Sequence, residues 1–416
     1  MQNRTALDWL NFLLADVKDG LGPFLAIYLM SSEHWDPARI GIIMTIGGIA
    51  TVAARTPAGA LVDRTTFKRG VIVAAAAMVA VGAAMLSLWP QFWPAAAAQT
   101  LIGLCDAAFP PAVAAISLGV VGRHGFTARV GRNEAFNHAG NAFTAIVAGL
   151  AGYLIAPAAV LWLVGAFAAA SIAATLAIDP GAIDHHVARG SDNNGDAAAR
   201  PSGLRTIFEC KPLLLFTAAI TLFHFANAAM LPLIGERLSQ GANGTQTLFM
   251  AACIIAAQIV MVPMAMLVGA KADAWGRKPL FLIGFAALPI RGVLYTLWGN
   301  PIYLVSIQLL DGIGAGIFGA LFFVVVADLT KGTGRYNLAL GAASAAWGLG
   351  AALSNSVAGF IAERAGFNAA FLFLAAIAAV AFLTYWLAVP ETASASRDSE
   401  PSRAWGERQS ELPVRR

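Results

Sequence analysis

The sequence has little charge and few cysteines for its length. Asp, Glu, Lys and Arg make up 12% of its 416 residues, whereas 58% are hydrophobic, and a typical soluble domain carries about 25% charged residues. This composition excludes an ordinary water-soluble domain. The three cysteines, Cys105, Cys210 and Cys253, have no spacing typical of metal ligands, so we expect neither a disulfide framework nor a metal site. The sequence also lacks a nucleophile elbow, a phosphate loop and a metal-binding helix motif, which argues against an enzyme, and we expect no cofactor.

Long apolar runs fill almost the whole chain instead. Runs of roughly 18 to 28 residues can cross a hydrocarbon core about 30 Å thick, and in lipid they must be helical because unpaired backbone groups are too costly there. The first run lacks a small-residue cleavage site, so we expect a retained helix rather than a signal peptide. The sequence predicts twelve transmembrane helices, at about 7–30, 38–62, 70–89, 92–122, 134–158, 159–178, 211–234, 246–272, 279–298, 301–329, 336–362 and 367–388.

The basic residues gather on one side of the predicted membrane. Most of the 27 Lys and Arg residues fall in the termini, the central linker and the short loops of one side, and only Arg39, Arg237 and Arg364 fall on the other. Because basic residues are retained in the cytoplasm, we expect a multi-pass protein of the cell (inner) membrane with both termini cytoplasmic. The net charge of +4 reflects this bias, and we infer no nucleic-acid binding from it.

A polar segment divides the helices into two groups of six. Residues 179–210 are rich in Gly, Pro, Asp and Asn and indicate a flexible cytoplasmic linker. We therefore expect an N-terminal six-helix bundle at 1–178 and a C-terminal six-helix bundle at 211–390. The segment 391–416 has the composition of a disordered cytoplasmic tail.

The two halves contain the same sequence pattern at an offset of about 210 residues. One copy follows helix two and the other follows helix eight; the matching residues are Gly59, Asp63, Arg64 and Lys68 in the first copy, and Gly269, Asp273, Gly276, Arg277 and Lys278 in the second. Gln99-x-Leu101-x-Gly103 is likewise echoed by Gln308-x-Leu310-x-Gly312, and Val147-Ala148-Gly149 by Val357-Ala358-Gly359. Matches in register across separate helices indicate an internal repeat.

At these positions the chain resembles the major facilitator superfamily, whose signature in both loops is Gly-x-x-x-Asp-Arg-x-Gly-Arg-Arg/Lys. The second copy departs from it at Ala274, and the first has Thr66 and Phe67 where Gly and Arg are usual. The resemblance covers essentially residues 5 to 390. It implies an all-α membrane protein of two pseudo-symmetric six-helix bundles that moves a small-molecule solute across the lipid bilayer, and we expect a monomer.

The resemblance also implies a gate at the cytoplasmic side. Asp63 would face the start of helix eleven near Arg335, and Asp273 the start of helix five near Arg132, where the helix dipole favours a carboxylate. These contacts would hold the cytoplasmic side closed in the outward-open state and break when the bundles rock. The alternative is that these charges only set topology, which would not explain the paired aspartates.

In the superfamily, helices one, four, seven and ten line the central cavity, and here each carries polar groups. Ionisable side chains at membrane depth are costly and point to function. The acidic ones are our candidates for proton coupling: Asp16, Asp19, Asp106 and Asp311. Lys18 is alternatively a structural partner for one aspartate. Drug-exporting members usually have an Arg in helix four, so Asp106 departs from their pattern.

Other polar or aromatic residues are candidates for the cavity or for substrate contact: Asn137, His138, Asn141, His224, Asn227 and Trp347. The two histidines are either proton carriers or hydrogen-bonded packing residues, and Trp347 either stacks on an aromatic substrate or packs. Arg55 is either a gate partner or a ligand contact. The resemblance places helix nine outside the cavity, so we expect Arg291 either to pair structurally or to snorkel to the interface.

Together these features favour proton-coupled secondary transport of a small organic solute, with multidrug-like export somewhat favoured over import. The departure in helix four and the many polar cavity groups keep an importer of an organic acid, sugar or metal chelate as an alternative. A membrane sensor or scaffold that does not transport is an alternative of another class, against which the gating aspartates argue.

Overall fold

The computed structural model describes residues 2–19, 22–185, 187–189, 210–240, 244–330 and 336–393, and all regular structure in these ranges is helical. The first half contains α1 (Gln2–Asp19), α2 (Gly22–Ser31), α3 (Pro37–Arg64), α4 (Lys68–Leu88), α5 (Phe92–Asp106), α6 (Phe109–Leu154) and α7 (Ala159–Leu176), followed by the short 3-10 helices η1 (Pro180–Ala182) and η2 (Val187–Arg189). The second half contains α9 (Lys211–Ala228), α10 (Met230–Gln240), α11 (Gln246–Trp275), α12 (Arg277–Leu294), α13 (Pro301–Leu329), α14 (Tyr336–Ala365) and α15 (Phe367–Ala388).

Nine helical segments in the described part of the chain are long and apolar enough to cross a membrane. The other three predicted spans carry charges or are broken. Helix one consists of α1 and α2, helix five is the part of α6 that follows a bend at Gly122, and helix nine is α12, which contains Arg277, Lys278 and Arg291. With these three, the described ranges contain the twelve transmembrane helices of an all-α membrane protein.

Proline explains where the helices predicted as continuous are interrupted. A proline has no backbone N–H to bond the carbonyl four residues earlier, so it favours a helix end at that residue. Helix four breaks at Asp106, four residues before Pro110, and helix seven breaks at Ala228, four residues before Pro232. Helix ten has no internal proline, and α13 is a single helix over Pro301–Leu329.

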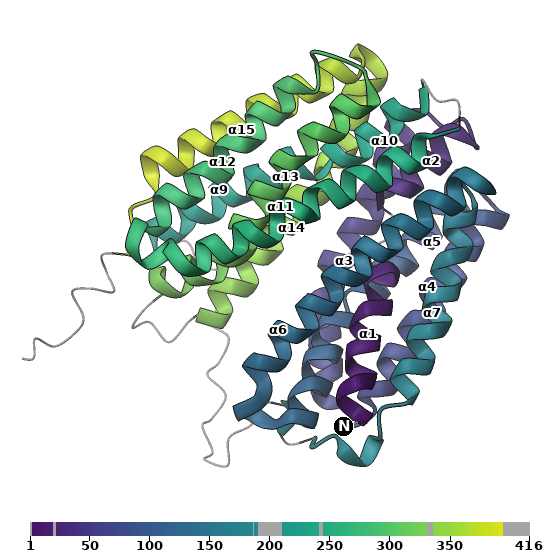
Figure 1. Ribbon diagram of the computed structural model, residues 1–416, viewed down its shortest axis with the longest axis vertical. Helices are drawn as coiled ribbons and strands as arrows, with labels where there is room; N and C mark the ends of the chain where they lie inside the picture. Colours follow the sequence, from purple (N-terminus) through teal and green to yellow (C-terminus); the bar gives the residue numbers. More distant parts are fainter. Residues whose placement is uncertain are drawn as a thin grey trace, which may run out of the picture.

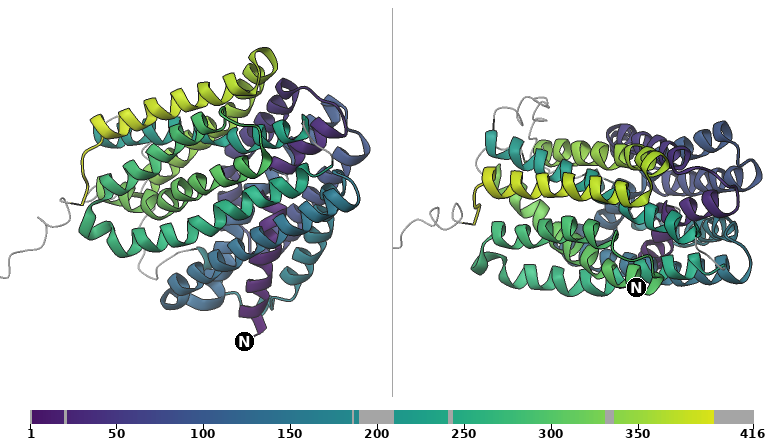
Figure 2. Two further views of the ribbon diagram at one scale, coloured as in Figure 1. Left: turned by 45° about the horizontal axis from the view of Figure 1, so that its top comes forward. Right: turned by 90° about the horizontal axis from the view of Figure 1, so that it is seen from above.

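The helices form two bundles with the same internal packing. In the first bundle α3 packs on α5, α4 on α7 and α1 on α6; in the second α11 packs on α13, α12 on α15 and α9 on α14. Each pair of the second bundle is the counterpart of one in the first, because the helices correspond in chain order. Figures 1 and 2 show the two bundles side by side, the purple-to-blue first half beside the green-to-yellow second half. This repeat of packing gives the pseudo-symmetry that the sequence predicted.

The bundles meet at the end of the molecule that holds α2 and α10, which we name the closed end. There α2 packs on α10, α3 on α14 and α6 on α11. Glycine permits the close approach: a Cβ added to Gly41 of α3 would lie 2.2 Å from the Asn355 carbonyl oxygen of α14, and one added to Gly359 would lie 2.3 Å from that of Pro37. Phe24 of α2 belongs to the same apolar core as the second bundle, so this end is sealed.

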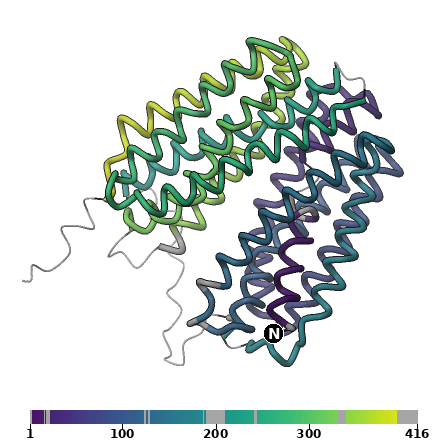
Figure 3. Tube along the Cα trace, viewed as in Figure 1, coloured from purple at the N-terminus to yellow at the C-terminus, as the bar shows by residue number. Residues whose placement is uncertain are grey.

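The bundles diverge toward the opposite end, where the N-terminus lies, and we name this the open end (Figures 1 and 3). The last polar contact between α3 and α14 in this direction is from Arg55 to the Ser344 carbonyl oxygen, 3.3 Å away. The gate residues that the structure describes belong to this end. The molecule is therefore closed at one end of the bundle interface.

Candidate functional site

A pocket of about 250 Å³ lies between the bundles, beside the break in helix four. We name it the interface pocket. Its polar lining comes from Thr51 of α3, Gln99 and Asp106 of α5, and Asn355 of α14. Glycines and apolar residues of α1, α2 and α3 supply most of the rest. Among the described lining residues the first bundle supplies all but Asn355, so the pocket lies in the first bundle and meets the second at that one residue.

Asp106 occupies a specific position in this pocket because α5 ends there. The C-terminal end of a helix carries a partial negative charge, so it disfavours a second negative charge and favours a proton or a cation. Asn355 adds an amide whose Oδ1 has no hydrogen-bond partner within the described ranges. Of the two coupling candidates whose side chains the structure describes, Asp106 lines the interface pocket and Asp311 does not. Thr51, Gln99 and Asn355 did not stand out as site residues in the sequence, although Gln99 belongs to the repeat.

An aromatic cluster with one cation spans the same interface on the side of the second bundle. The His224 ring lies 4.3 Å from both the Phe318 ring and the Trp347 ring, between centroids. Arg55 comes from α3 of the other bundle, and its guanidinium lies 5.4 Å from the Trp347 ring. The Trp347 indole Nε1 has no hydrogen-bond partner in the part of the chain that the structure describes. We name these four residues the aromatic cluster; they provide stacking surface and one unused donor.

Asp311 and Asn227 are engaged inside the second bundle. The Arg291 guanidinium forms an ion pair with the Asp311 carboxylate and donates a hydrogen bond to Asn227 Oδ1, 2.5 Å away. Arg291 is buried, with 2% of its surface exposed. This group joins α9, α12 and α13, so the prediction that Arg291 pairs structurally agrees with its contacts. Asp311 therefore remains a candidate for proton coupling, but as the ion-pair partner of a buried cation.

The helix-one candidates fall where the structure gives no side-chain description. Asp16 and Asp19 belong to α1, but their side chains, and that of Lys18, lie outside the described residues. Three of the cavity candidates, Asn137, His138 and Asn141, lie on helix five. Asn137 lines a smaller pocket of about 150 Å³ between α1 and α6. His138 and Asn141 are half-buried on the same helix, and His138 Nδ1 has no hydrogen-bond partner within the described ranges.

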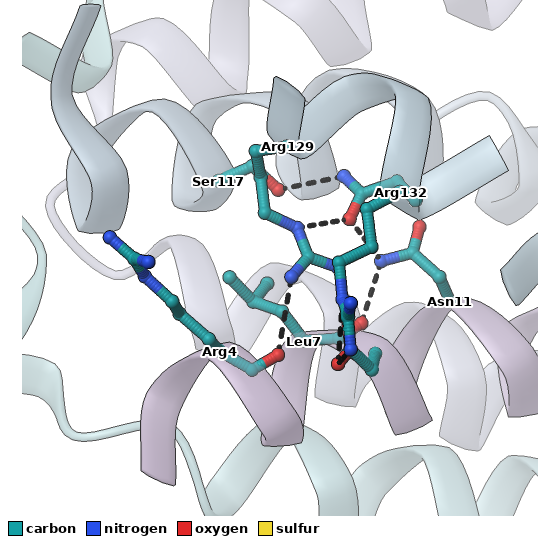
Figure 4. Close-up of polar contacts among 8 residues, drawn as sticks. Arg4, Leu7, Asn11, Ser117, Arg129 and Arg132 are labelled. Carbon is teal, nitrogen blue, oxygen red and sulfur yellow. Dashed lines mark hydrogen bonds and ion pairs between the residues drawn. The ribbon is translucent and has the colours of Figure 1, made fainter. Parts of the chain in front are cut away.

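A buried polar network ties α1 to α6 at the open end (Figure 4). Two arginines converge on the Asp8 carboxylate: Arg129 Nη2 lies 2.6 Å from Oδ1 and Arg132 Nη2 lies 2.8 Å from Oδ2. Asn133 Oδ1 accepts hydrogen bonds from Arg129 Nε at 2.6 Å and from Asn11 Nδ2 at 3.0 Å. The sequence offered one signal for this network, because an aspartate inside an apolar run needs a cation partner.

The gate residues make contacts within their own bundles in this conformation. Arg132 binds Asp8, and the Asp273 carboxylate binds Arg277 Nη1 at 2.7 Å. Asp63 and Arg64 are exposed, and Arg335 lies outside the described residues. A Cβ added to Gly59 or Gly269 would meet nothing within 4 Å. Within the described residues, Asp273 and Arg132 therefore each bind a partner in their own bundle and not one another.

In both signature copies, a basic side chain donates a hydrogen bond to a backbone carbonyl oxygen near the C-terminal end of a helix. Lys68 is fully buried, and its Nζ donates to the Val62 carbonyl oxygen at 2.6 Å. Arg277 Nη1 donates to the Ala272 carbonyl oxygen at 3.1 Å, and Ala272 occupies the position of Val62 in the second copy. Cations are stabilised at helix C-termini, where carbonyl groups lack intrahelical partners. In the second copy Gly276 then turns the chain with φ of 92°, and Glu391 accepts a hydrogen bond from the Lys278 N–H.

Comparison with known proteins identifies the family. A sequence model described as Major Facilitator Superfamily matches residues 9–270 and 253–414. The chain belongs to the major facilitator superfamily. Two relatives from Mycobacterium tuberculosis, strains CDC 1551 / Oshkosh and ATCC 25618 / H37Rv, are 53% identical over 388 residues, which is 93% of this chain and of each relative. Both bear the name uncharacterized MFS-type transporter.

Solved structures of the superfamily share the fold at low sequence identity. The nucleoside transporter NupG superposes with a TM-score of 0.78 at 16% identity, over 93% of this chain and 98% of that one. A bacterial homologue of the human lysosomal transporter Spinster, in an inward-facing and unoccupied conformation, superposes with a TM-score of 0.72 at 11% identity, over 96% and 98%. The protein is thus a multi-pass membrane transporter of the major facilitator superfamily and not an enzyme.

Proposed function

We propose that the protein is a proton-coupled secondary transporter of the cell membrane that moves a small organic solute by alternating access, with export favoured over import. The interface pocket is the observation that carries this proposal. It combines a carboxylate, an amide oxygen without a partner and apolar walls, and its lining belongs to both bundles. A solute bound there contacts both halves at once, so rocking of the bundles changes its access.

Asp106 is the residue to which we assign proton coupling. It lines the interface pocket at the C-terminal end of α5, where a second negative charge is disfavoured. A proton on this carboxylate changes the charge of the pocket without changing its shape. Loading and release of that proton would then alter the affinity of the site for a charged or polar solute.

An organic solute with a flat ring fits the aromatic cluster best. His224, Phe318 and Trp347 present stacking faces close to the interface, and Arg55 adds a positive charge above the indole ring. This surface favours aromatic or amphipathic solutes over small sugars and supports the preference for multidrug-like export. We further propose that the open end faces the cytoplasm, because most basic residues lie on that side, so that the conformation described is inward-facing.

The test is solute-dependent proton movement in proteoliposomes with an imposed pH gradient. Internal pH is followed while organic cations, anions and neutral aromatic compounds are added one at a time. We expect proton movement with at least one aromatic compound and its loss in Asp106→Asn. Asp179→Asn is the matched control, because Asp179 lies after α7 and caps η1.

Three outcomes would revise the proposal. Proton movement that persists in Asp106→Asn would reject the assignment of the coupling residue. Flux of solute without proton movement would reject proton coupling, and absence of flux with the whole panel would favour the sensor or scaffold. Opposite gradients in right-side-out and inside-out vesicles decide the direction, since an exporter accumulates solute only in the inside-out vesicles.

A further inference from the structure

We propose that Glu236 is a proton-binding site inside the closed end, and that the proton it takes up stabilises the closed arrangement of α2 against α10. The inference rests on the alternating access of the proposed function, but not on proton coupling or on the identity of the solute. Sequence analysis did not select Glu236, because it follows directly on the apolar run of predicted helix seven.

Glu236 is buried without a hydrogen-bond partner for one of its oxygens. Only 2% of its surface is exposed, and Oε2 has no donor within the described residues. An ionised carboxylate in such surroundings costs far more than a neutral one, because the group is buried and its Oε2 has no donor within the described residues. The acid form is therefore the one that the closed arrangement accommodates.

Glu236 lies where the two bundles touch. It is on α10, which packs on α2 of the other bundle. A Cβ added to its neighbour Gly235 would lie 3.1 Å from Ile27 Cγ1 and 3.2 Å from the Pro23 carbonyl oxygen, both on α2. Movement of α10 away from α2 would hence open this region to the solvent outside the closed end. Burial of Glu236 is in this way tied to the rocking of the bundles.

The charges nearby do not neutralise Glu236. Arg237, the next residue, turns away and donates to the Tyr295 carbonyl oxygen at 2.5 Å. Asp36 of the other bundle acts electrostatically on Glu236, and it is itself paired with Arg39. The negative charge of Asp36 therefore adds to the cost of an ionised Glu236 in the closed arrangement.

The other elements packed on α10 offer no charged partner. These elements are α2, α9, α11, α14 and α15. α2 and α15 carry no charged residue, and α9 and α11 carry theirs toward the open end. Within the part of the chain that the structure describes, the remaining titratable or charged groups of these helices and of the loop before α3 form no ion pair or hydrogen bond with Glu236; they are Tyr28, Glu33, His34, Lys211, His224, Cys253, Lys271, Asp273, Glu363, Arg364 and Tyr385.

These contacts define a sequence of events. When the closed end opens, water reaches Glu236, which loses its proton and repels Asp36. Uptake of a proton from the same side removes that repulsion and lets α2 and α10 close again. Acidity on that side thus favours the closed arrangement. Because each molecule takes up at most one proton at this site, the ratio of closed to open molecules changes by at most about tenfold per pH unit.

The experiment measures the distance between spin labels at Ser32 and Gln240. The native cysteines are replaced by alanine, and the labelled protein is studied in lipid nanodiscs over a range from acidic to alkaline pH. Both positions are exposed, at the ends of α2 and α10. We expect the short-distance population of the otherwise wild-type protein to fall as pH rises. Glu236→Gln, an uncharged isostere, should keep the short distance at every pH. Glu363→Gln, an exposed glutamate on α14, is the matched control and should titrate like the wild type.

A chemical measurement covers the case in which the label variants do not fold. Dicyclohexylcarbodiimide modifies protonated carboxyl groups in apolar surroundings, and peptide mass spectrometry locates the product. We expect modification of Glu236 in the unlabelled protein at acidic pH and its loss at alkaline pH. A titration of the label distance that is the same in Glu236→Gln, or a pH-independent distance in the wild type, would overturn the proposal. So would absence of modification at acidic pH. Loss of solute-dependent proton flux in Asp106→Asn alone leaves this inference untouched.

Discussion

At the scale of single residues, buried charge is the most informative feature of this chain. A membrane protein places charges at depth only where a partner or a function compensates them. Arg291 and Asp311 compensate each other in the second bundle, Asp8 is compensated by Arg129 and Arg132, and Asp106 lines the interface pocket. Of the four aspartates that the sequence offered as coupling candidates, the described surroundings separate two, because Asp311 is paired with Arg291 and Asp106 lines the interface pocket.

The Arg291–Asp311 pair gives the first prediction. Arg291→Met leaves the Asp311 carboxylate without its cation in a buried site, which costs about 3–5 kcal/mol, so we expect a clear drop in Tm in detergent. The double variant Arg291→Met with Asp311→Asn should recover most of that loss, because neither charge remains. Arg364→Met, on α14 beside Phe360, serves as the control. A single Asp311→Asn variant that keeps its Tm but loses proton flux would instead make Asp311 the coupling residue.

The partners of these residues were not predictable from the sequence. Asp8 and Arg129 are 121 positions apart, and Arg291 and Asn227 are 64 apart. Hydropathy and spacing describe one helix at a time, so they indicate that a buried charge needs a partner but not which helix supplies it. Glu236 was missed for a related reason, because its burial depends on the arrangement of the other bundle.

At the scale of elements, the sequence predicted helices well and their ends less well. The predicted spans 301–329 and 367–388 coincide with α13 and α15. Helices four and seven were predicted as continuous but are broken four residues before Pro110 and Pro232. Helices four and five were predicted as separate, and within α6 they are separated at Gly122, whose φ of 69° and ψ of 175° are not helical. In helices four and seven, the position of proline therefore indicates the break that the apolar pattern does not.

The end of α15 caps the start of α12 and gives the second prediction. Glu391 accepts hydrogen bonds from the backbone N–H groups of Arg277 and Lys278, each at 3.0 Å. Burial opposes ionisation of Glu391, but the hydrogen bonds from Ala393, Lys278, Arg277 and Thr392 outweigh it and hold the pKa of Glu391 below its ordinary value of 4.5. The ionised carboxylate therefore stabilises the fold.

Glu391→Gln should lower the free energy of unfolding at neutral pH by up to about 1 kcal/mol, since the group is partly exposed, and Tm should fall accordingly. Because the folded-state pKa is depressed, this stabilisation is complete above pH 4.5 and is lost as pH falls through the lower folded-state value. The difference in Tm between wild type and variant should hence shrink as the pH is lowered below 4.5. Glu363→Gln should show no difference at either pH, and an equal difference at both would disprove the cap.

At the scale of the whole molecule, close glycine contacts hold the closed end together. The added Cβ of Gly41 would lie 2.2 Å from a backbone oxygen of α14, which has no rotamer by which to move away. The third prediction is that Gly41→Ala forces α3 and α14 apart and lowers the closed population of the Ser32–Gln240 label pair about tenfold, since overpacking costs about 1–3 kcal/mol.

The control for this variant is Gly165→Ala in α7, where an added Cβ meets nothing within 4 Å. It should leave the label distances unchanged. Unchanged distances in Gly41→Ala as well would mean that the helices yield without separating, and the closed end would then owe its stability to its apolar core and not to backbone contact.

The interruptions four residues before a proline occur in some helices and not in others. Proline lies four residues beyond the helix end in helices four and seven, whereas α13 continues without interruption for 29 residues. Gly312 and Gly316 seat α13 against α11, where added Cβ atoms would lie 2.3 and 2.5 Å from backbone oxygens. Bending during a transport cycle would then fall on one broken helix in each bundle, helix four in the first and helix seven in the second, while α13 stays fixed against α11.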